Sequence, residues 1–378
     1  MDTPLSASTR RDFLKASAAL TAGAALSSTA LAGCSSPAPG YRDAVRATWR
    51  HADPAPAGVQ AVQRELVRYA TLAPSSHNTQ CWRYRLGDRA LTIEPDLSRR
   101  CAVADPDDHH VFATLGCAAE NVVHAARAYG LDADVAFDGA TGHVRVALES
   151  GPTARTDLFE AIVRRQSTRG AYDGQPLAAD DLGRLERTGS DGVGVILVTD
   201  RGQMEQVLEY VVAGNAAQVG DPAFVAELKH WIRFNEADAV RTGDGLFTRC
   251  SGNPTSPHWL GGFLFDRFLD AEKENEKVAA QLRSSAGLAV FVSEADDPAH
   301  WVDAGRCYER FALRGTVLDV RNAMLNQPTE VADLRPQLAS YLGVGPRRVD
   351  LLVRFGRGPD MPRSLRRPLD DVLLPVAP

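Results

Sequence analysis

The chain has 378 residues, of which 44% are hydrophobic and 24% charged, and its formal net charge is −6 at pH 7. This length and this hydrophobic content suffice for two ordinary domains or one large one. Lys and Arg form no basic stripe or block outside the N-terminal region, so the sequence gives no indication of nucleic-acid binding.

The first 33 residues have the features of an export signal. Thr9–Lys15 (TRRDFLK) resembles the twin-arginine export motif, and an apolar run rich in Ala and Leu follows it. Leu31–Cys34 (LAGC) resembles a lipobox, in which Cys34 becomes lipidated and forms the new N-terminus. The alternative is an ordinary cleaved signal with a chance cysteine. The sequence predicts export through the twin-arginine translocase to the periplasm or cell surface, with lipid on Cys34 as the only membrane attachment.

Apolar spacing in the first half predicts an amphipathic helix, a polar loop, a hairpin, a long helix rich in small residues, and two further strands. In chain order these are 59–72, 73–82, 83–95, 110–129, 132–137 and 143–148. A helix over 157–165 follows the Gly151-Pro152-Thr153 break.

The second half repeats this coarse order. We expect strands at 193–198, 287–293 and 349–355, and helices at 202–217, 221–234, 263–283, 297–319 and 331–342. Gly, Pro, Ser and aromatic residues fill 238–262, which is a candidate lid. The expected organisation is a signal at 1–33, a tether at 34–57, a first domain at 58–152 and a second domain at 153–378.

Cysteine and histidine spacing predicts no metal site. The five cysteines besides Cys34 are scattered and contain no C-x-x-C pair, so a disulfide framework is not expected, although a single bridge remains open. His109-His110 lacks the i, i+4 spacing of a zinc helix, and we interpret this pair as structural or surface residues.

Two polar motifs stand out. Pro74–Trp82 (PSSHNTQCW) crowds hydroxyl and amide groups between two apolar segments, which suits the polar edge of a flat ligand, although a turn would also use such residues. Arg165, Ser167 and Arg169 follow a predicted helix at i, i+2 and i+4. This set can grip a phosphate through guanidinium and hydroxyl donors, and the alternative is a solvated basic helix end.

Together these motifs resemble those of the FMN-dependent nitroreductase family. Pro74–Trp82 is similar to its P-S-S-x-N-x-Q-P-W signature, with Cys81 in place of Pro, and 165–169 is similar to its R-x-S-x-R phosphate motif. Trp301–Leu342 and Ser364–Leu369 resemble its C-terminal region and basic tail. Because the loop precedes the phosphate motif here, the chain resembles the Acg-like branch, in which two such domains are fused.

The resemblance implies an α+β, nitroreductase-like fold whose two tandem domains form an intrachain pseudo-dimer around one flavin site. It implies FMN as cofactor and NAD(P)H as a candidate electron donor. The cofactor-binding residues that it implies are Pro74, Ser75, Ser76, Asn78 and Gln80 at the ribityl chain and pyrimidine edge, Arg165, Ser167, Arg169, Arg366 and Arg367 at the phosphate, and Met324 and Leu325 along one flavin face. No motif calls for a side-chain acid or base, so we predict no catalytic residue.

Three hypotheses remain open at this point. The first is an oxidoreductase that passes electrons through the flavin to a small electron-poor acceptor, such as a nitroaromatic or a quinone. The alternative is a non-catalytic protein that holds or sequesters flavin, because nicotinamide cofactors are scarce outside the cytoplasm and a lid over the flavin would exclude a hydride donor. A third hypothesis is a lipid-anchored scaffold without flavin. A pseudo-dimer within one chain is compatible with a monomer.

Overall fold

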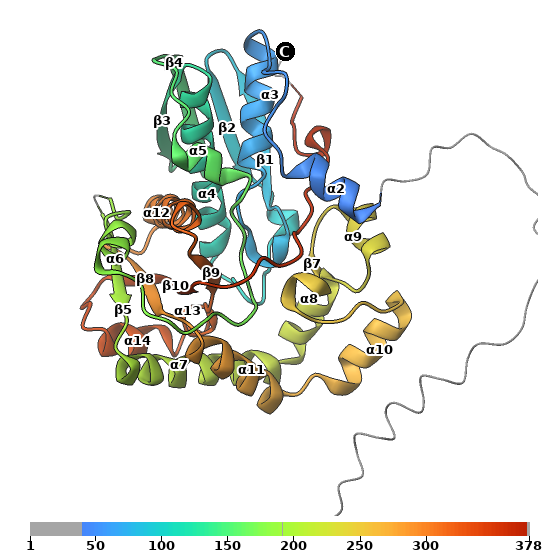
Figure 1. Cartoon of the computed structure of the whole chain (residues 1–378), viewed down its shortest axis with the longest axis vertical. Coiled ribbons are helices and arrows are strands. Elements are labelled where there is room, and N and C mark those ends of the chain that lie inside the picture. Colours follow the sequence, from blue (N-terminus) through green and yellow to red (C-terminus); the bar gives the residue numbers. More distant parts are fainter. Residues whose placement is uncertain (1–39, 191, 376–378) are drawn as a thin grey trace, which may run out of the picture. The chain divides into compact units, whose positions relative to one another are not determined.

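The computed structural model of the chain describes residues 40–190 and 192–375 (Figure 1). The first half contains α2 (Tyr41–Thr48), α3 (Val59–Ala70), β1 (Trp82–Gly87), β2 (Ala90–Pro95), α4 (His109–Ala128), β3 (Leu131–Asp138), β4 (His143–Ser150) and α5 (Asp157–Ile162). The second half contains α6 (Ala179–Glu186), β5 (Val193–Val198), α7 (Arg201–Gly220), α8 (Pro222–Trp231), β6 (Ile232–Arg233), α9 (Glu236–Thr242), β7 (Leu246–Phe247), α10 (His258–Phe268), α11 (Ala271–Arg283), β8 (Gly287–Ser293), α12 (Pro298–Val317), β9 (Arg321–Met324), α13 (Gln327–Glu330), α14 (Arg335–Tyr341) and β10 (Arg348–Gly356).

The two four-stranded sheets have the same topology. Their strand orders are β1-β2-β4-β3 and β5-β8-β10-β9, and all neighbouring strands are antiparallel. In each sheet a long helix, α4 or α12, links the second strand to the third. One arrangement of helix and antiparallel sheet therefore occurs twice in the chain, which is the tandem α+β organisation predicted from the sequence.

The two long helices cross at a point where both contribute a glycine (Figure 1). A Cβ atom on Gly116 of α4 would lie 1.9 Å from the carbonyl oxygen of Val302, and a Cβ on Gly305 of α12 would lie 1.9 Å from the carbonyl oxygen of Ala113. The backbones touch, so only glycine fits at these two positions. This reciprocal contact holds the two halves together at the centre of the main core.

We expect Gly305→Ala to lower the free energy of unfolding by about 1–3 kcal/mol, because the added methyl group must push two packed backbones apart. Gly262 is the matched control. It lies within α10, and its added Cβ would come no closer than 3.5 Å to a side-chain carbon of Lys229. Gly262→Ala should leave stability unchanged or raise it slightly. Chemical denaturation of the two variants measures both, and equal effects would contradict the close crossing.

A helical insertion distinguishes the second half from the first. A short turn joins β1 to β2, whereas α7 to α11 lie between β5 and β8. Helices α7 and α11, with α14, pack a second hydrophobic cluster against the outer face of this sheet (Figure 1). As a result every residue of β8 is buried, whereas β3 alternates between half-buried and exposed positions.

Three segments differ from the sequence prediction. Within the predicted tether, residues 41–48 form α2, whose Tyr41 hydroxyl donates a hydrogen bond of 2.6 Å to the Arg363 carbonyl oxygen. The candidate lid at 238–262 contains most of α9 and the start of α10 rather than irregular chain. The helix predicted at 263–283 is broken at Asp270, whose side chain caps the start of α11. Cys34 and the signal lie outside the described residues.

The described cysteines and the His109-His110 pair are buried. Cys81, Cys101, Cys117, Cys250 and Cys307 are free thiols in the described part of the chain, so the single disulfide left open by the sequence does not form among them. His109 and His110 are 1% and 7% exposed, which selects the structural interpretation of this pair over the surface one. Within residues 40–190 and 192–375, none of the helices is both long enough and apolar enough to cross a bilayer.

Candidate functional site

One pocket brings the two sequence motifs together, although they lie about ninety residues apart. It is lined by Trp49, Pro74, Ser75, Asn78, Arg165, Gln166, Ser167, Arg169, Leu246, Cys250, Pro362, Arg363, Ser364 and Arg366. The first half thus contributes the polar loop, and the second half contributes the Arg-Ser-Arg segment, the 246–250 segment and the C-terminal tail. The open volume is about 60 Å³, roughly that of two water molecules in the liquid.

The backbone of the polar loop is strained, and a side-chain amide of the loop holds it in place. His77, Asn78 and Gln80 have φ values of 47°, 54° and 55°, a left-handed conformation that non-glycine residues seldom adopt. The Asn78 side-chain amide donates to the carbonyl oxygens of Gly245, at 3.1 Å, and Leu365, at 3.3 Å. Such strain persists only where the surroundings fix it, and it concentrates at functional sites.

Gln80 does not line the pocket. Its side chain connects the polar loop to the helical insertion and to the C-terminal tail. Its side chain is fully buried, its amide nitrogen donates to the Gly243 carbonyl oxygen at 2.8 Å, and its oxygen accepts from the Arg367 backbone N–H at 2.9 Å. Gly243 has φ of 64°, and a Cβ there would lie 2.6 Å from the Arg366 carbonyl oxygen. The loop, the insertion and the tail are therefore locked together at this residue.

Arg165 lines the pocket and is buried there with part of its guanidinium group unused by the described residues. It is 2% exposed, its Nη2 donates to the Leu72 carbonyl oxygen at 3.0 Å, and its Nε lies 3.3 Å from Oε1 of the buried Glu309. Within the described part of the chain, its Nη1 has no hydrogen-bond partner. A buried guanidinium group with unused donors is costly unless an anion meets it.

Arg169 is the second cation of the site. It is half-buried, and burial lowers its pKa. Among residues 40–190 and 192–375, no carboxylate pairs with its side chain. Ser167 is placed beside it by a parallel bridge to Asn322 of β9, and the Thr168 N–H donates to the Asn322 carbonyl oxygen at 2.8 Å. The strand β9, absent from the sequence prediction, thus positions the Arg-Ser-Arg segment.

Arg366 lines the pocket but uses all its donors within the protein. Its N–H groups are directed at the carbonyl oxygens of residues 71, 72, 73 and 365 and at Oδ1 of Asn78. A guanidinium group has five N–H donors, so none remains free for a ligand. Burial, together with the neighbouring Arg165 charge, lowers the pKa of Arg366 to about 9. The geometry favours a positioning role for this residue.

The remaining predicted residues do not line the pocket. These are Ser76, Gln80, Met324, Leu325 and Arg367. Leu325 is buried in the second hydrophobic cluster, and Met324 packs against the main core. Sequence reasoning missed Trp49, Gln166, Leu246, Cys250, Pro362, Arg363 and Ser364. Of these, Arg363 belongs to the arginine-rich tail, which was a signal for it, whereas Trp49 lies in the predicted tether.

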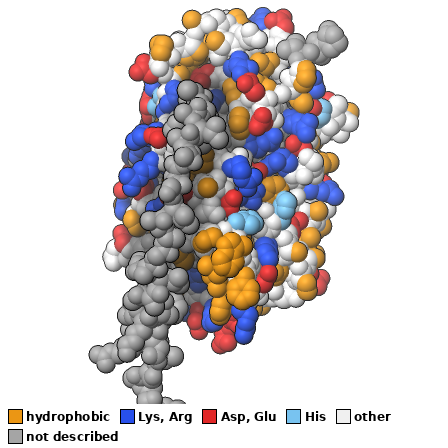
Figure 2. All heavy atoms as spheres, turned by 90° about the vertical axis from the view of Figure 1, so that its right-hand side faces the viewer, with side chains coloured by type: hydrophobic (Ala, Val, Ile, Leu, Met, Phe, Trp, Pro, Cys, Tyr) orange, Lys and Arg blue, Asp and Glu red, His pale blue; other side chains and the backbone are white. Residues whose placement is uncertain are grey.

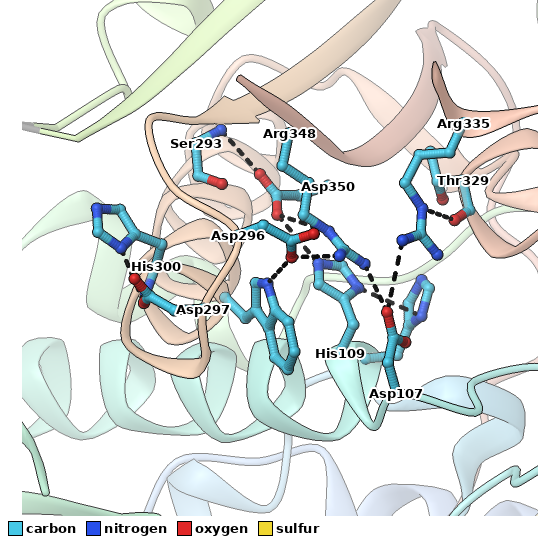
Figure 3. Close-up of polar contacts among 12 residues, drawn as sticks. Asp107, His109, Ser293, Asp296, Asp297, His300, Thr329, Arg335, Arg348 and Asp350 are labelled. Carbon is cyan, nitrogen blue, oxygen red and sulfur yellow. Dashed lines mark hydrogen bonds and ion pairs between the residues drawn. The ribbon is translucent and has the colours of Figure 1, made fainter. Parts of the chain in front are cut away.

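A second polar cluster, around His109, joins the two halves away from the pocket (Figure 3). His109 Nε2 lies 3.1 Å from Oδ1 of Asp350, and the other carboxylate oxygen of Asp350 accepts from the Ser293 N–H. Asp105, His109 and His110 come close enough to hold a metal ion. The Asp105 carboxylate, however, accepts from the His110 N–H and Nδ1. The Asp105 carboxylate therefore has a structural role, because these hydrogen bonds support the N-terminal end of α4.

Two buried carboxyls give the fold a pH dependence. Burial raises the pKa of Glu309 to about 7, against the opposing charge of Arg165, and burial also raises the pKa of Asp350 to about 7. A carboxyl whose pKa is raised in the folded state stabilises the fold below its unfolded pKa of about 4, and this contribution is lost as the pH rises to about 7.

We therefore expect wild-type stability to fall between about pH 4 and pH 7, by roughly 1–3 kcal/mol per group. Glu309→Gln removes one titrating group and should flatten this part of the profile, and Glu309→Gln with Asp350→Asn should flatten it further. Thermal unfolding across this range measures the slope. Identical slopes in the wild type and the double variant would contradict the assignment of both carboxyls.

Comparisons with known proteins agree with the motifs. The family model described as "TAT (twin-arginine translocation) pathway signal sequence" matches residues 8–27. The chain is 26% identical over 327 residues to "Putative NAD(P)H nitroreductase Rv3131" of Mycobacterium tuberculosis, covering 82% of this chain and 90% of that protein. The chain is a nitroreductase homologue with a twin-arginine signal.

Solved structures similar to this nitroreductase homologue include two flavoenzymes. One is a nitroreductase with bound FMN from Bacteroides fragilis, with 17% identity, a TM-score of 0.33, and coverage of 54% of this chain and 89% of that one. The other is the FMN-dependent nitroreductase NfnB from Mycobacterium smegmatis in complex with NADPH, with 12% identity, a TM-score of 0.38, and coverage of 57% and 96%.

Proposed function

We propose that this protein binds one FMN in the pocket between its two halves and acts as an oxidoreductase on small electron-poor acceptors such as nitroaromatics or quinones. The observation that carries the proposal is the convergence of the strained polar loop with Arg165, Ser167 and Arg169 in one pocket. The nitroreductase names of its relatives support the same reading.

The residues present fit the phosphate end of FMN. The unpartnered Arg165 Nη1, the Arg169 guanidinium and the Ser167 hydroxyl supply donors of the kind that a phosphate requires. Bound FMN would supply electron transfer at its ring system. The chain's part is to hold the phosphate, to present Ser75 and Asn78 to the rest of the cofactor and to exclude water.

The experiment is a titration of the apoprotein with FMN and with riboflavin, followed by quenching of flavin fluorescence. FMN should bind at least about tenfold more tightly than riboflavin, because only FMN offers the phosphate that pairs with two guanidinium groups. Equal affinities would place the phosphate outside the pocket.

A second candidate function, holding flavin without turnover, is favoured by the closed pocket. Leu246 and Cys250 line it, and the same segment is tied to the loop by the Gly245 N–H, which donates to the Asn78 carbonyl oxygen at 3.0 Å. A segment held across the pocket in this way would limit the access of an electron donor to bound flavin.

Anaerobic stopped-flow mixing of the FMN-loaded protein with NADPH separates the two candidates. The oxidoreductase proposal expects the flavin bands to bleach as two electrons pass from NADPH to the flavin, and to recover when a quinone is added. Gln80→Ala frees the covering segment from the loop and should accelerate reduction. If the flavin stays oxidised in both the wild type and Gln80→Ala, the oxidoreductase proposal is wrong and the holding function is retained.

We further propose the domain boundaries 58–152 and 153–378, Acg-like membership, a monomeric state and a lipid anchor at Cys34, with placement in the periplasm or at the cell surface. The twin-arginine signal supports export. In cells supplied with a labelled fatty acid, the wild type should incorporate the label and Cys34→Ser should not. Equal labelling of the variant would place the lipid elsewhere.

A further inference from the structure

Helix α10 turns large apolar side chains toward solvent. Trp259 is 74% exposed, Phe263 and Phe268 are each 60% exposed, and Leu264 is 38% exposed. Trp259 and Phe263 form one stripe four residues apart, and Leu264 with Phe268 forms the adjacent stripe. Figure 2 shows hydrophobic side chains gathered on this face, next to histidines. Single exposed apolar residues are ordinary, but a contiguous group of this size marks a contact surface.

One charged residue of α10 is neutralised by an ion pair, whereas Arg267 keeps its charge. Lys229 of α8 pairs with Asp266 of α10, and the guanidinium of Arg267 lies over the ring of Phe268, 5.8 Å from its centre. A hollow between α8 and α10 is lined by the apolar residues Ile232, Phe234, Trp259 and Phe263 and by the polar or charged residues Lys229, His230, Arg233, His258 and Asp266. The surface therefore suits a partner that combines an apolar layer with polar groups.

The described chain begins on the same side of the molecule. Gly40 leads directly into α2, which packs against α9, and His258 at the start of α10 lies 2.9 Å from Oδ2 of Asp238 in α9. In Figure 1 the start of α2, α9 and α10 all lie on the right. The twin-arginine signal occupies residues 8–27. Gly40 is the sixth residue after Cys34, a reach of about 20 Å when fully extended.

We propose that α10 is a membrane-contact helix, which lies along the bilayer interface with Trp259, Phe263 and Phe268 inserted. The signal carries the N-terminal segment to the membrane, and the short chain before Gly40 keeps the body within reach of it. Aromatic side chains favour the boundary between headgroups and acyl chains. The helix thus supplies a second attachment that does not depend on lipid at Cys34.

Cosedimentation with phosphatidylethanolamine–phosphatidylglycerol vesicles tests this. The protein used is Pro39–Pro378, which forms one compact unit and lacks the signal and Cys34. We expect it to bind the vesicles, with little change between about 0.05 and 0.5 M salt because insertion is apolar. Trp259→Ser with Phe263→Ser and Phe268→Ser should weaken binding at least about tenfold.

The matched control replaces exposed apolar residues elsewhere, Val59→Ser with Leu97→Ser and Tyr341→Ser, and should bind like the wild type. Tryptophan fluorescence should shift to the blue on binding, and the α10 variant, which lacks Trp259 but keeps the buried Trp82, Trp231 and Trp301 and the half-buried Trp49, should not show this shift. Unfolding midpoints verify that both triple variants fold. The proposal is overturned if the wild type fails to bind vesicles, if the α10 variant binds equally well, or if sedimentation shows a dimer that only the α10 variant loses.

Discussion

Replacing both Arg165 and Arg169 with Ala should abolish FMN binding. Each guanidinium group removed costs about 1.5–3 kcal/mol of phosphate binding, or roughly 10- to 150-fold in affinity. Of the two single variants, Arg169→Ala is more informative than Arg165→Ala, because the Arg169 side chain has no carboxylate partner among the described residues. Its loss should weaken FMN binding while leaving the stability of the apoprotein unchanged.

Arg164 provides the matched control. It lies next to Arg165, is exposed, and does not line the pocket. Arg164→Ala removes the same charge and should leave FMN affinity within about twofold of wild type, since exposed charges contribute little. Fluorescence titration with FMN measures all variants. Full occupancy of the Arg165→Ala, Arg169→Ala protein would place the phosphate elsewhere.

Arg366→Ala should have the opposite effect to Arg169→Ala, because it should lower the stability of the apoprotein. Five acceptors each lose one hydrogen bond when this half-buried side chain is removed. The carbonyl oxygens of Leu72 and Leu365 keep a second donor, from Arg165 and Asn78. We expect the apoprotein to lose about 3 kcal/mol or more of stability, because unsatisfied buried carbonyl groups are costly. Denaturant titration without flavin measures this. The Arg366→Lys variant should recover only part of it, since an ammonium group offers three donors in place of five.

The two arginines therefore separate binding from positioning. If Arg366→Ala keeps wild-type stability and loses FMN, then Arg366 is a phosphate ligand and the positioning role is wrong. If Arg169→Ala destabilises the apoprotein as strongly as Arg366→Ala does, then Arg169 supports the fold and leaves Arg165 as the main phosphate donor.

Periodicity predicted the repeated frame of the fold. The two long helices and the strands of both sheets, apart from the four-residue β9, have clear apolar spacing, and the structure has them within a few residues. Strand β9 carries too few residues for a periodic signal, although it positions Ser167. The small helices of the insertion were missed because glycine and proline dominate 238–262, and α2 was missed because the preceding Ser-Pro segment indicated a tether.

The site was predictable only in its motif residues. The loop and the Arg-Ser-Arg segment were visible because polar groups are dense there. No sequence pattern indicated that Arg366 donates its hydrogen bonds to carbonyl oxygens of the first half, because these contacts depend on where the C-terminal tail folds back. Gln80 is another case, because a buried amide that bridges two segments looks in sequence like any polar loop residue.

The most direct test of the account is the visible spectrum and flavin stoichiometry of the purified chain. We predict flavin absorption bands after incubation with FMN and removal of excess, with one FMN per chain. This value follows because the sequence contains the loop motif once and the Arg-Ser-Arg motif once, and both line the same pocket. A colourless protein, or two FMN per chain, would contradict it.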